Sequence, residues 1–215
     1  MKECSFLKKS DTADSTETLL IDAFGLSKKL GRVPFPLAVK VSSGYHVIPI
    51  DLTKKHDKEL VNKLQLALTK FLETIRSSQP VYKGKRINDV GRKIESQIVH
   101  ELNKLPLTVR QLGKTGYPDI EILFEEQIAY LEMKTSSVTN RSRLRYFYYT
   151  GGNKIQSNAH HLLLTIFATP DNPGYWKVEN LMLSDLHTLD VQLKTEFNAS
   201  KDDLIDKSTS LIVIK

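Results

Sequence analysis

The first half of the chain carries apolar residues at three- and four-residue spacing, which is typical of helices that bury one face. This spacing predicts an amphipathic helix over residues 56–77, with Leu60, Leu64, Leu68, Phe71 and Ile75 on its buried face. A second helix is predicted to begin at Asn88 or Asp89, because both side chains can cap a helix. Its inward face would hold Ile94, Ile98, Leu102 and Leu105. Glu95 lies at the margin of that face, directly after Ile94.

Alternation of apolar and polar residues predicts strands further along the chain. The predicted strands are residues 107–112, 119–124, 128–135 and 174–183. A hairpin-like pair of short strands is expected between Ala38 and Asp51, and residues 211–215 are a candidate edge strand. A third helix is expected over residues 154–167, with Ile155, Ala159, Leu162, Leu163 and Ile166 on its apolar face. The order helix, three strands, helix, strand predicts an α/β architecture with a mixed sheet flanked by helices.

The second and third of these strands form an antiparallel hairpin if residue 124 pairs with residue 127. This register places Asp119 opposite Glu132. Because side chains alternate between the two faces of a strand, the apolar residues share one face, which consists of Ile120, Ile122, Ala129, Leu131 and Met133. The other face then carries Asp119, Glu121, Glu132 and Lys134.

The polar face of this hairpin concentrates negative charge. Directly opposed residues in a sheet have Cβ atoms roughly 4.5–5.5 Å apart, so Asp119 and Glu132 would repel each other unless a cation lay between them. Mg²⁺ is the expected cation, since it prefers oxygen ligands and is held by one or two carboxylates together with waters and phosphate oxygens. Lys134 follows Glu132 on the same face and would lie beside the attacking water. This combination suits phosphodiester hydrolysis.

The distribution of charge favours an acidic partner. The chain of 215 residues has a formal net charge of +6, which indicates nucleic acid first and an anionic membrane second. Residues 134–170 contain no Asp or Glu and follow the proposed metal ligands directly. The cations in this segment that are candidates for DNA contact are Arg141, Arg143, Arg145 and Lys154.

Several classes of protein are excluded or disfavoured by what the sequence lacks. The only cysteine, Cys4, has no partner for a disulfide or a zinc site. No apolar run is long enough for a transmembrane helix, and the first residues lack the apolar core of a signal peptide, so a cytoplasmic protein is expected. Gly151-Gly152 lacks the Lys and Ser/Thr of a phosphate-binding loop, which disfavours an NTPase. One domain is expected over residues 1–215.

The sequence Gly116-Tyr117-Pro118-Asp119, followed by Glu132-Met133-Lys134, resembles the signature of the PD-(D/E)XK nuclease superfamily. The resemblance covers residues 88–185 and implies a restriction-endonuclease-like catalytic core of the order α-β-β-β-α-β. Residues 1–80 would then be an N-terminal embellishment of helical and hairpin additions. The resemblance implies that Asp119 and Glu132 bind the metal and that Lys134 assists the attacking water. It also implies an acidic contribution from the preceding helix, a position that Glu95 matches.

These features favour a Mg²⁺-dependent endonuclease that cuts double-stranded DNA, of the type II restriction class. Restriction enzymes of this fold commonly act as homodimers, so the resemblance implies a homodimer here. Two alternatives remain open. The chain could be a repair, junction-resolving or transposition nuclease of the same fold, or it could be a DNA-binding module without catalytic activity.

Overall fold

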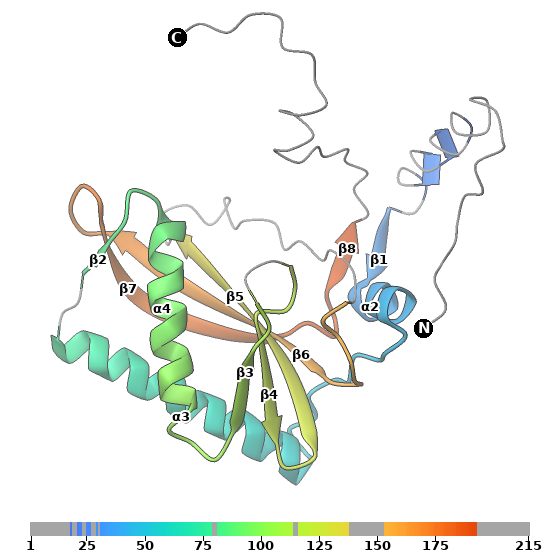
Figure 1. The fold of residues 1–215 in the computed structure, drawn as a ribbon, viewed down its shortest axis with the longest axis horizontal. Coiled ribbons are helices and arrows are strands. Elements are labelled where there is room, and N and C mark those ends of the chain that lie inside the picture. The colour runs from blue at the N-terminus through green and yellow to red at the C-terminus, as the bar shows by residue number, and fades with distance from the viewer. Residues whose placement is uncertain are drawn as a thin grey trace, which may run out of the picture. The chain divides into compact units, whose positions relative to one another are not determined.

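A computed structural model describes residues 31–78, 81–113, 116–137 and 153–192, together with residues 18, 21–22, 25–26 and 29. The elements are β1 (Arg32–Pro34), α2 (Phe35–Ser43), α3 (Lys55–Ser78), β2 (Tyr82–Lys83), α4 (Ile87–Leu102), β3 (Thr108–Gln111), β4 (Ile120–Phe124), β5 (Gln127–Ser137), β6 (His160–Pro170), β7 (Tyr175–Asp185) and β8 (Asp190–Gln192) (Figure 1). The chain divides into two compact units, one of them Pro34–Asp190 and the other made of the two terminal segments. The smaller unit includes most of the two-stranded β1-β8 sheet.

The larger unit is built on a six-stranded sheet with the order β2-β7-β6-β5-β4-β3. Only β5 and β6 run parallel, and the other neighbouring strands are antiparallel. Helices α3 and α4 contact each other and share one apolar core with the sheet (Figure 1). This arrangement confirms the predicted mixed α/β architecture and is consistent with a restriction-endonuclease-like core.

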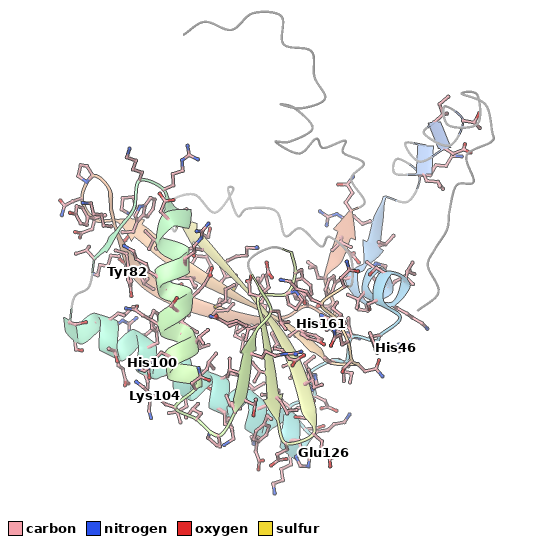
Figure 2. The ribbon with its side chains drawn as sticks, in the orientation of Figure 1. His46, Tyr82, His100, Lys104, Glu126 and His161 are labelled. Carbon is pink, nitrogen blue, oxygen red and sulfur yellow. The ribbon has the colours of Figure 1, made fainter. Side chains whose placement is uncertain are left out.

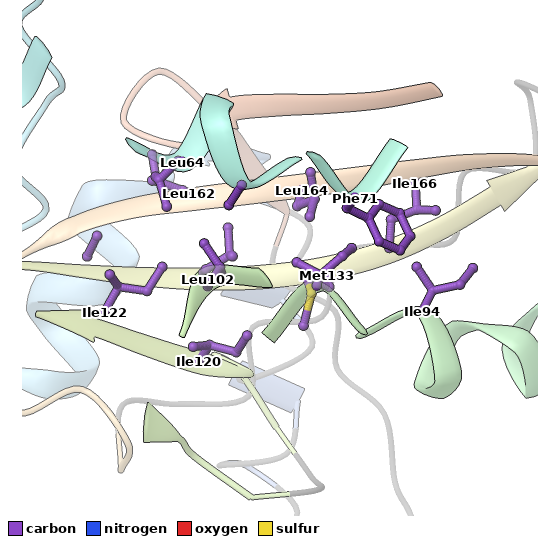
Figure 3. Packing of buried hydrophobic residues seen from close by; sticks show 14 of the residues in the cluster. Leu64, Phe71, Ile94, Leu102, Ile120, Ile122, Met133, Leu162, Leu164 and Ile166 are labelled. Carbon is purple, nitrogen blue, oxygen red and sulfur yellow. The ribbon is translucent and has the colours of Figure 1, made fainter. Parts of the chain in front are cut away.

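The two long helices form where the apolar spacing predicts them. The buried side chains of α3 include Leu60, Leu64, Phe71 and Ile75, and those of α4 include Ile94, Ile98 and Leu102. These side chains pack against Ile120, Ile122, Met133, Leu162, Leu164 and Ile166 of the sheet (Figure 3). Each fully buried Leu or Ile contributes roughly 1.5–3 kcal/mol to stability, so this contact is the main attachment of both helices to the sheet.

The predicted hairpin between Ala38 and Asp51 is wrong, because the first part of this segment is helix α2. Phe35 and Val39 are both fully buried and lie four residues apart, which is the spacing of one helix face. Gly44 follows the helix with a φ of 82° and its N–H donates to the Lys40 carbonyl. The glycine therefore caps a helix instead of turning a hairpin.

The predicted helix at 154–167 is also wrong, since residues 160–170 form strand β6. This strand lies between β5 and β7, and most of its residues are buried and apolar with little alternation, as in a strand that is covered on both faces. A short apolar run of this kind is ambiguous between a buried helix and a buried strand. The β-branched and aromatic residues Thr165, Ile166 and Phe167 favour the strand. The candidate edge strand at 211–215 lies outside the described residues.

Candidate active site

The hairpin of β4 and β5 has the register that the sequence predicts. Ile120 pairs with Leu131 and Phe124 pairs with Gln127, and this pairing ends at Ile120. Strand β5 continues to Ser137 with β6 as its partner. The sheet therefore opens between β4 and β5 beyond Leu131. Glu132 and Lys134 lie on the part of β5 that borders this opening.

Asp119 is placed at the opening by a hydrogen bond to the backbone of β5. It directly precedes β4, and its Oδ2 atom accepts a hydrogen bond of 2.8 Å from the N–H of Met133. Its own carbonyl accepts a hydrogen bond of 2.9 Å from the N–H of Leu112. The Asp119 carboxylate thus accepts a hydrogen bond from the backbone of β5 just beyond the end of β4, and it lies next to Glu132.

Glu132 is the most buried carboxylate of this group, with 4% of its surface exposed. Its Oε1 atom lies 2.5 Å from the Nζ atom of Lys134, while its Oε2 atom is buried without a hydrogen-bond partner. Burial, followed by the charge of Asp119, raises the pKa of Glu132 to about 7, although Lys134 acts in the opposite direction. A buried carboxylate with an unused oxygen next to a second carboxylate is a suitable environment for a cation.

Glu95 reaches the same charge cluster from helix α4. Burial raises its pKa, the charge of Asp119 raises it further, and Lys134 and Arg92 lower it. Gly91 lies one turn earlier in the helix, and a Cβ atom there would be 3.0 Å from the Thr135 hydroxyl. The glycine therefore permits the close approach of α4 to β5. The four residues Glu95, Asp119, Glu132 and Lys134 are brought together.

Glu121 shares the polar face of the hairpin but has a separate partner. Its carboxylate forms an ion pair with the guanidinium of Arg110 on β3, at 3.0 Å. The two residues are directly paired across the β3–β4 ladder. Cross-strand pairs of opposite charge stabilise a sheet, and this pairing gives Glu121 a structural role.

The basic residues that the sequence nominates for DNA contact divide into two groups. Arg141, Arg143 and Arg145 lie outside the described residues. Lys154 is described, and its Nζ atom donates hydrogen bonds to the carbonyls of Gly116 at 2.7 Å and Pro118 at 3.0 Å. The segment that leads into Asp119 therefore has a cation bound to its backbone.

An aromatic cluster beside this segment is not evident from the sequence. Tyr117 is buried, stacks on His161 at 5.8 Å between ring centroids, and shares a hydrogen bond of 2.7 Å with its Nδ1 atom. His161 is labelled in Figure 2. Phe35 of α2 meets both rings edge-on. These contacts join parts of the chain far apart in sequence, so local patterning gives no signal for them.

A second group of possible metal ligands lies on other elements. His56 and Glu59 of α3 and Glu125 of the β4–β5 turn offer ligand atoms within 4.8 Å of one another. His56 Nδ1 and Glu125 Oε2 already share a hydrogen bond of 2.8 Å, and both side chains are more than half exposed. Among the described residues it is the only group of three such ligands at this spacing. Asp119 and Glu132 form a separate pair of carboxylates and are not part of this group of three.

The titration of Glu132 predicts an unusual pH dependence of stability in metal-free protein. Because its pKa is raised when folded, the folded state retains a proton that the unfolded state loses between about pH 4.5 and pH 7. The contribution of Glu132 to the free energy of unfolding is therefore favourable at low pH and falls as the pH rises. The free energy of unfolding of Glu132→Gln, relative to wild type, should increase by about 2–3 kcal/mol between pH 5 and pH 8. Urea unfolding in EDTA measures this difference, and a difference independent of pH would contradict it.

The mixed sheet with its flanking helices is consistent with a restriction-endonuclease-like core, and it carries an acidic pair and a lysine at the opening between β4 and β5. The family model of the type II restriction enzyme MjaV family matches residues 28–208. The type II restriction enzyme MjaV of Methanocaldococcus jannaschii is 34% identical over 199 residues, covering 82% of this chain and 86% of the relative. This chain therefore belongs to the type II restriction enzyme MjaV family. In the described part of the chain, no helix has the length and apolar character needed to cross a membrane.

Proposed function

We propose that this chain is a Mg²⁺-dependent type II restriction endonuclease that cuts both strands of DNA at a specific sequence. The observation that carries the proposal is the convergence of Asp119, Glu132 and Lys134 where β4 and β5 separate. Membership of a type II restriction enzyme family supports the same activity. As part of a restriction system it would act in the cytoplasm, and as a homodimer it would present one site to each DNA strand.

Asp119 and Glu132 are the residues that would hold the metal. Carboxylate oxygens without His or Cys in the ligand set favour a hard cation such as Mg²⁺ over zinc. When bound, the ion would polarise the scissile phosphate and lower the pKa of a water molecule. The unused Glu132 Oε2 atom and the repulsion between the two carboxylates support cation binding at this position.

Lys134 and Glu95 have different parts in the proposed mechanism. The ion pair with Glu132 fixes the Lys134 ammonium, which can orient the attacking water and stabilise the negative charge that develops on the phosphate. Glu95 adds a carboxylate from α4 at the border of the same cluster, where burial and the charge of Asp119 raise its pKa, so it is a candidate for proton transfer.

Digestion of supercoiled plasmid with Mg²⁺ tests the proposed activity. A sequence-specific enzyme yields discrete, reproducible fragments. Nicking only at mismatches or branched structures would instead indicate a repair or junction-resolving enzyme. Salt-sensitive binding without cleavage of any DNA would indicate a binding module.

Binding to DNA should depend steeply on ionic strength. Arginines that contact phosphates release condensed counterions, and the logarithm of the binding constant falls by about 0.9 per contact for each unit in the logarithm of salt concentration. We expect Arg141→Gln, Arg143→Gln and Arg145→Gln each to reduce the slope by about one if the residue contacts a phosphate. Fluorescence anisotropy in Ca²⁺ over a range of salt measures the slope. A flat response for the wild type would contradict phosphate contact.

A further inference from the structure

The segment from Gly116 to Asp119 determines where one of the proposed metal ligands lies. Gly116 has a φ of 77°, a conformation that suits glycine, and the segment makes no ladder with a neighbouring strand. Its position therefore depends on contacts made by individual side chains. Two such contacts come from the region just before β6, where Lys154 lies.

Lys154 holds the backbone on both sides of Tyr117. Its ammonium donates to the carbonyls of Gly116 and Pro118, which uses two of its three N–H groups. Pro118 directly precedes Asp119, so the second of these bonds fixes the peptide that leads into the metal ligand. The side chain is half-buried.

The side chain of Tyr117 is held independently on β6. Its hydroxyl shares a hydrogen bond with His161, and its ring is buried against His161 and Phe35. Asp119 itself is bound to the N–H of Met133 at the far end of the segment. The segment is therefore held at three places. Lys154 binds its backbone, His161 binds the side chain of Tyr117, and the N–H of Met133 binds the carboxylate of Asp119.

We infer that Lys154 is a positioning residue, which acts on catalysis by holding the Gly116–Asp119 segment instead of by binding a DNA phosphate. This inference rests on the proposed function of Asp119 as a metal ligand. Groups that orient a metal ligand typically change metal affinity or activity by 10- to 100-fold when they are removed. Removal of the Lys154 ammonium is expected to change metal affinity by the same factor.

The test compares Lys154→Met with Lys70→Met in the full chain. Lys70 lies on the exposed side of α3 and is not among the residues that hold the segment, so its substitution removes the same charge at another position. Mn²⁺ binding is measured by electron paramagnetic resonance, and DNA binding is measured in Ca²⁺. Lys154→Met should weaken Mn²⁺ binding and raise the Mg²⁺ concentration needed for cleavage by roughly 10- to 100-fold, with DNA affinity equal to that of Lys70→Met. Lys154→Arg, which keeps N–H donors, should restore most of the metal affinity.

Two outcomes would overturn the inference. Weaker DNA binding with a salt slope reduced by about one and unchanged Mn²⁺ binding would make Lys154 a phosphate contact. Unchanged behaviour in both assays would show that the segment does not need Lys154. Should Lys154→Met fail to fold, Lys154→Gln keeps a polar side chain with one fewer N–H donor and no charge, and should also weaken Mn²⁺ binding; wild-type Mn²⁺ affinity in this variant would contradict the inference.

A failure of the proposed function gives a different result. In that case Asp119→Asn would leave Mn²⁺ binding of the otherwise wild-type chain unchanged. A loss of Mn²⁺ binding in Asp119→Asn with no loss in Lys154→Met would reject the positioning role alone. A single set of Mn²⁺ titrations therefore distinguishes a failure of metal ligation by Asp119 from a failure of the positioning role of Lys154.

Discussion

Replacement of Asp119 with Asn is expected to reduce DNA cleavage by at least about 10²–10³-fold while leaving DNA binding in Ca²⁺ within a few-fold of wild type. The amide keeps the size of the side chain and can still accept the hydrogen bond from Met133 N–H, so the segment should remain in place. What it removes is the negative charge that, with Glu132, makes the site attractive to a divalent cation. Single-turnover cleavage at saturating DNA isolates this effect from binding.

Glu121→Gln is the matched control for this substitution. Glu121 lies on β4, two residues after Asp119, and its substitution also removes one negative charge, but its partner is Arg110 on β3. Cleavage by Glu121→Gln should therefore remain close to wild type. Full activity in Asp119→Asn would refute metal ligation by Asp119, and equal losses in both variants would indicate a general effect of charge on the hairpin.

Replacement of Lys134 with Met is expected to lower cleavage by about 10²–10³-fold and also to destabilise the protein. The ammonium lies 2.5 Å from Glu132 Oε1 and is the cation that opposes the repulsion between Glu132 and Asp119. Without it, the pKa of Glu132 should rise further. Breaking a buried pair typically costs about 3–5 kcal/mol, and about 3 kcal/mol is an upper value here because 31% of the Lys134 side chain is exposed.

The stability effect of Lys134→Met distinguishes an ion-pair role from a loss of packing. In the double variant Glu132→Gln/Lys134→Met, the uncompensated carboxylate is gone, so most of the lost free energy of unfolding should return. Cleavage should stay absent in the double variant. A double variant as unstable as Lys134→Met would show that the methylene stem of Lys134, and not its charge, supports the fold.

The hairpin that carries the site could be predicted because its information is local. Alternation sets which residues of β4 and β5 share a face, and the short turn at Glu125 and Glu126 sets the register. The apolar spacing of α4 likewise placed Glu95 beside the buried face. These features need no knowledge of distant parts of the chain, so the metal-ligand candidates were accessible from the sequence.

The surroundings of the site were not predictable because they depend on distant contacts. The opening between β4 and β5 follows from the longer pairing of β5 with β6, and the apolar spacing of residues 154–167 predicts a helix where β6 lies. Lys154 and His161 contact the Gly116–Asp119 segment from across a long connection, so no short motif reveals them. The β-branched residues Val39 and Val41 favour a strand in the segment of α2, whereas the burial of Phe35 and Val39 on one face stabilises a helix there.

Digestion of unmethylated phage DNA, followed by sequencing of the fragment ends, tests whether the chain cuts DNA at one specific sequence. Wild-type protein with Mg²⁺ should produce ends that share one short sequence, and EDTA or Glu132→Gln should leave the DNA intact. Cleavage by Glu132→Gln at the same positions as the wild type, or fragment ends without a common sequence, would contradict the account.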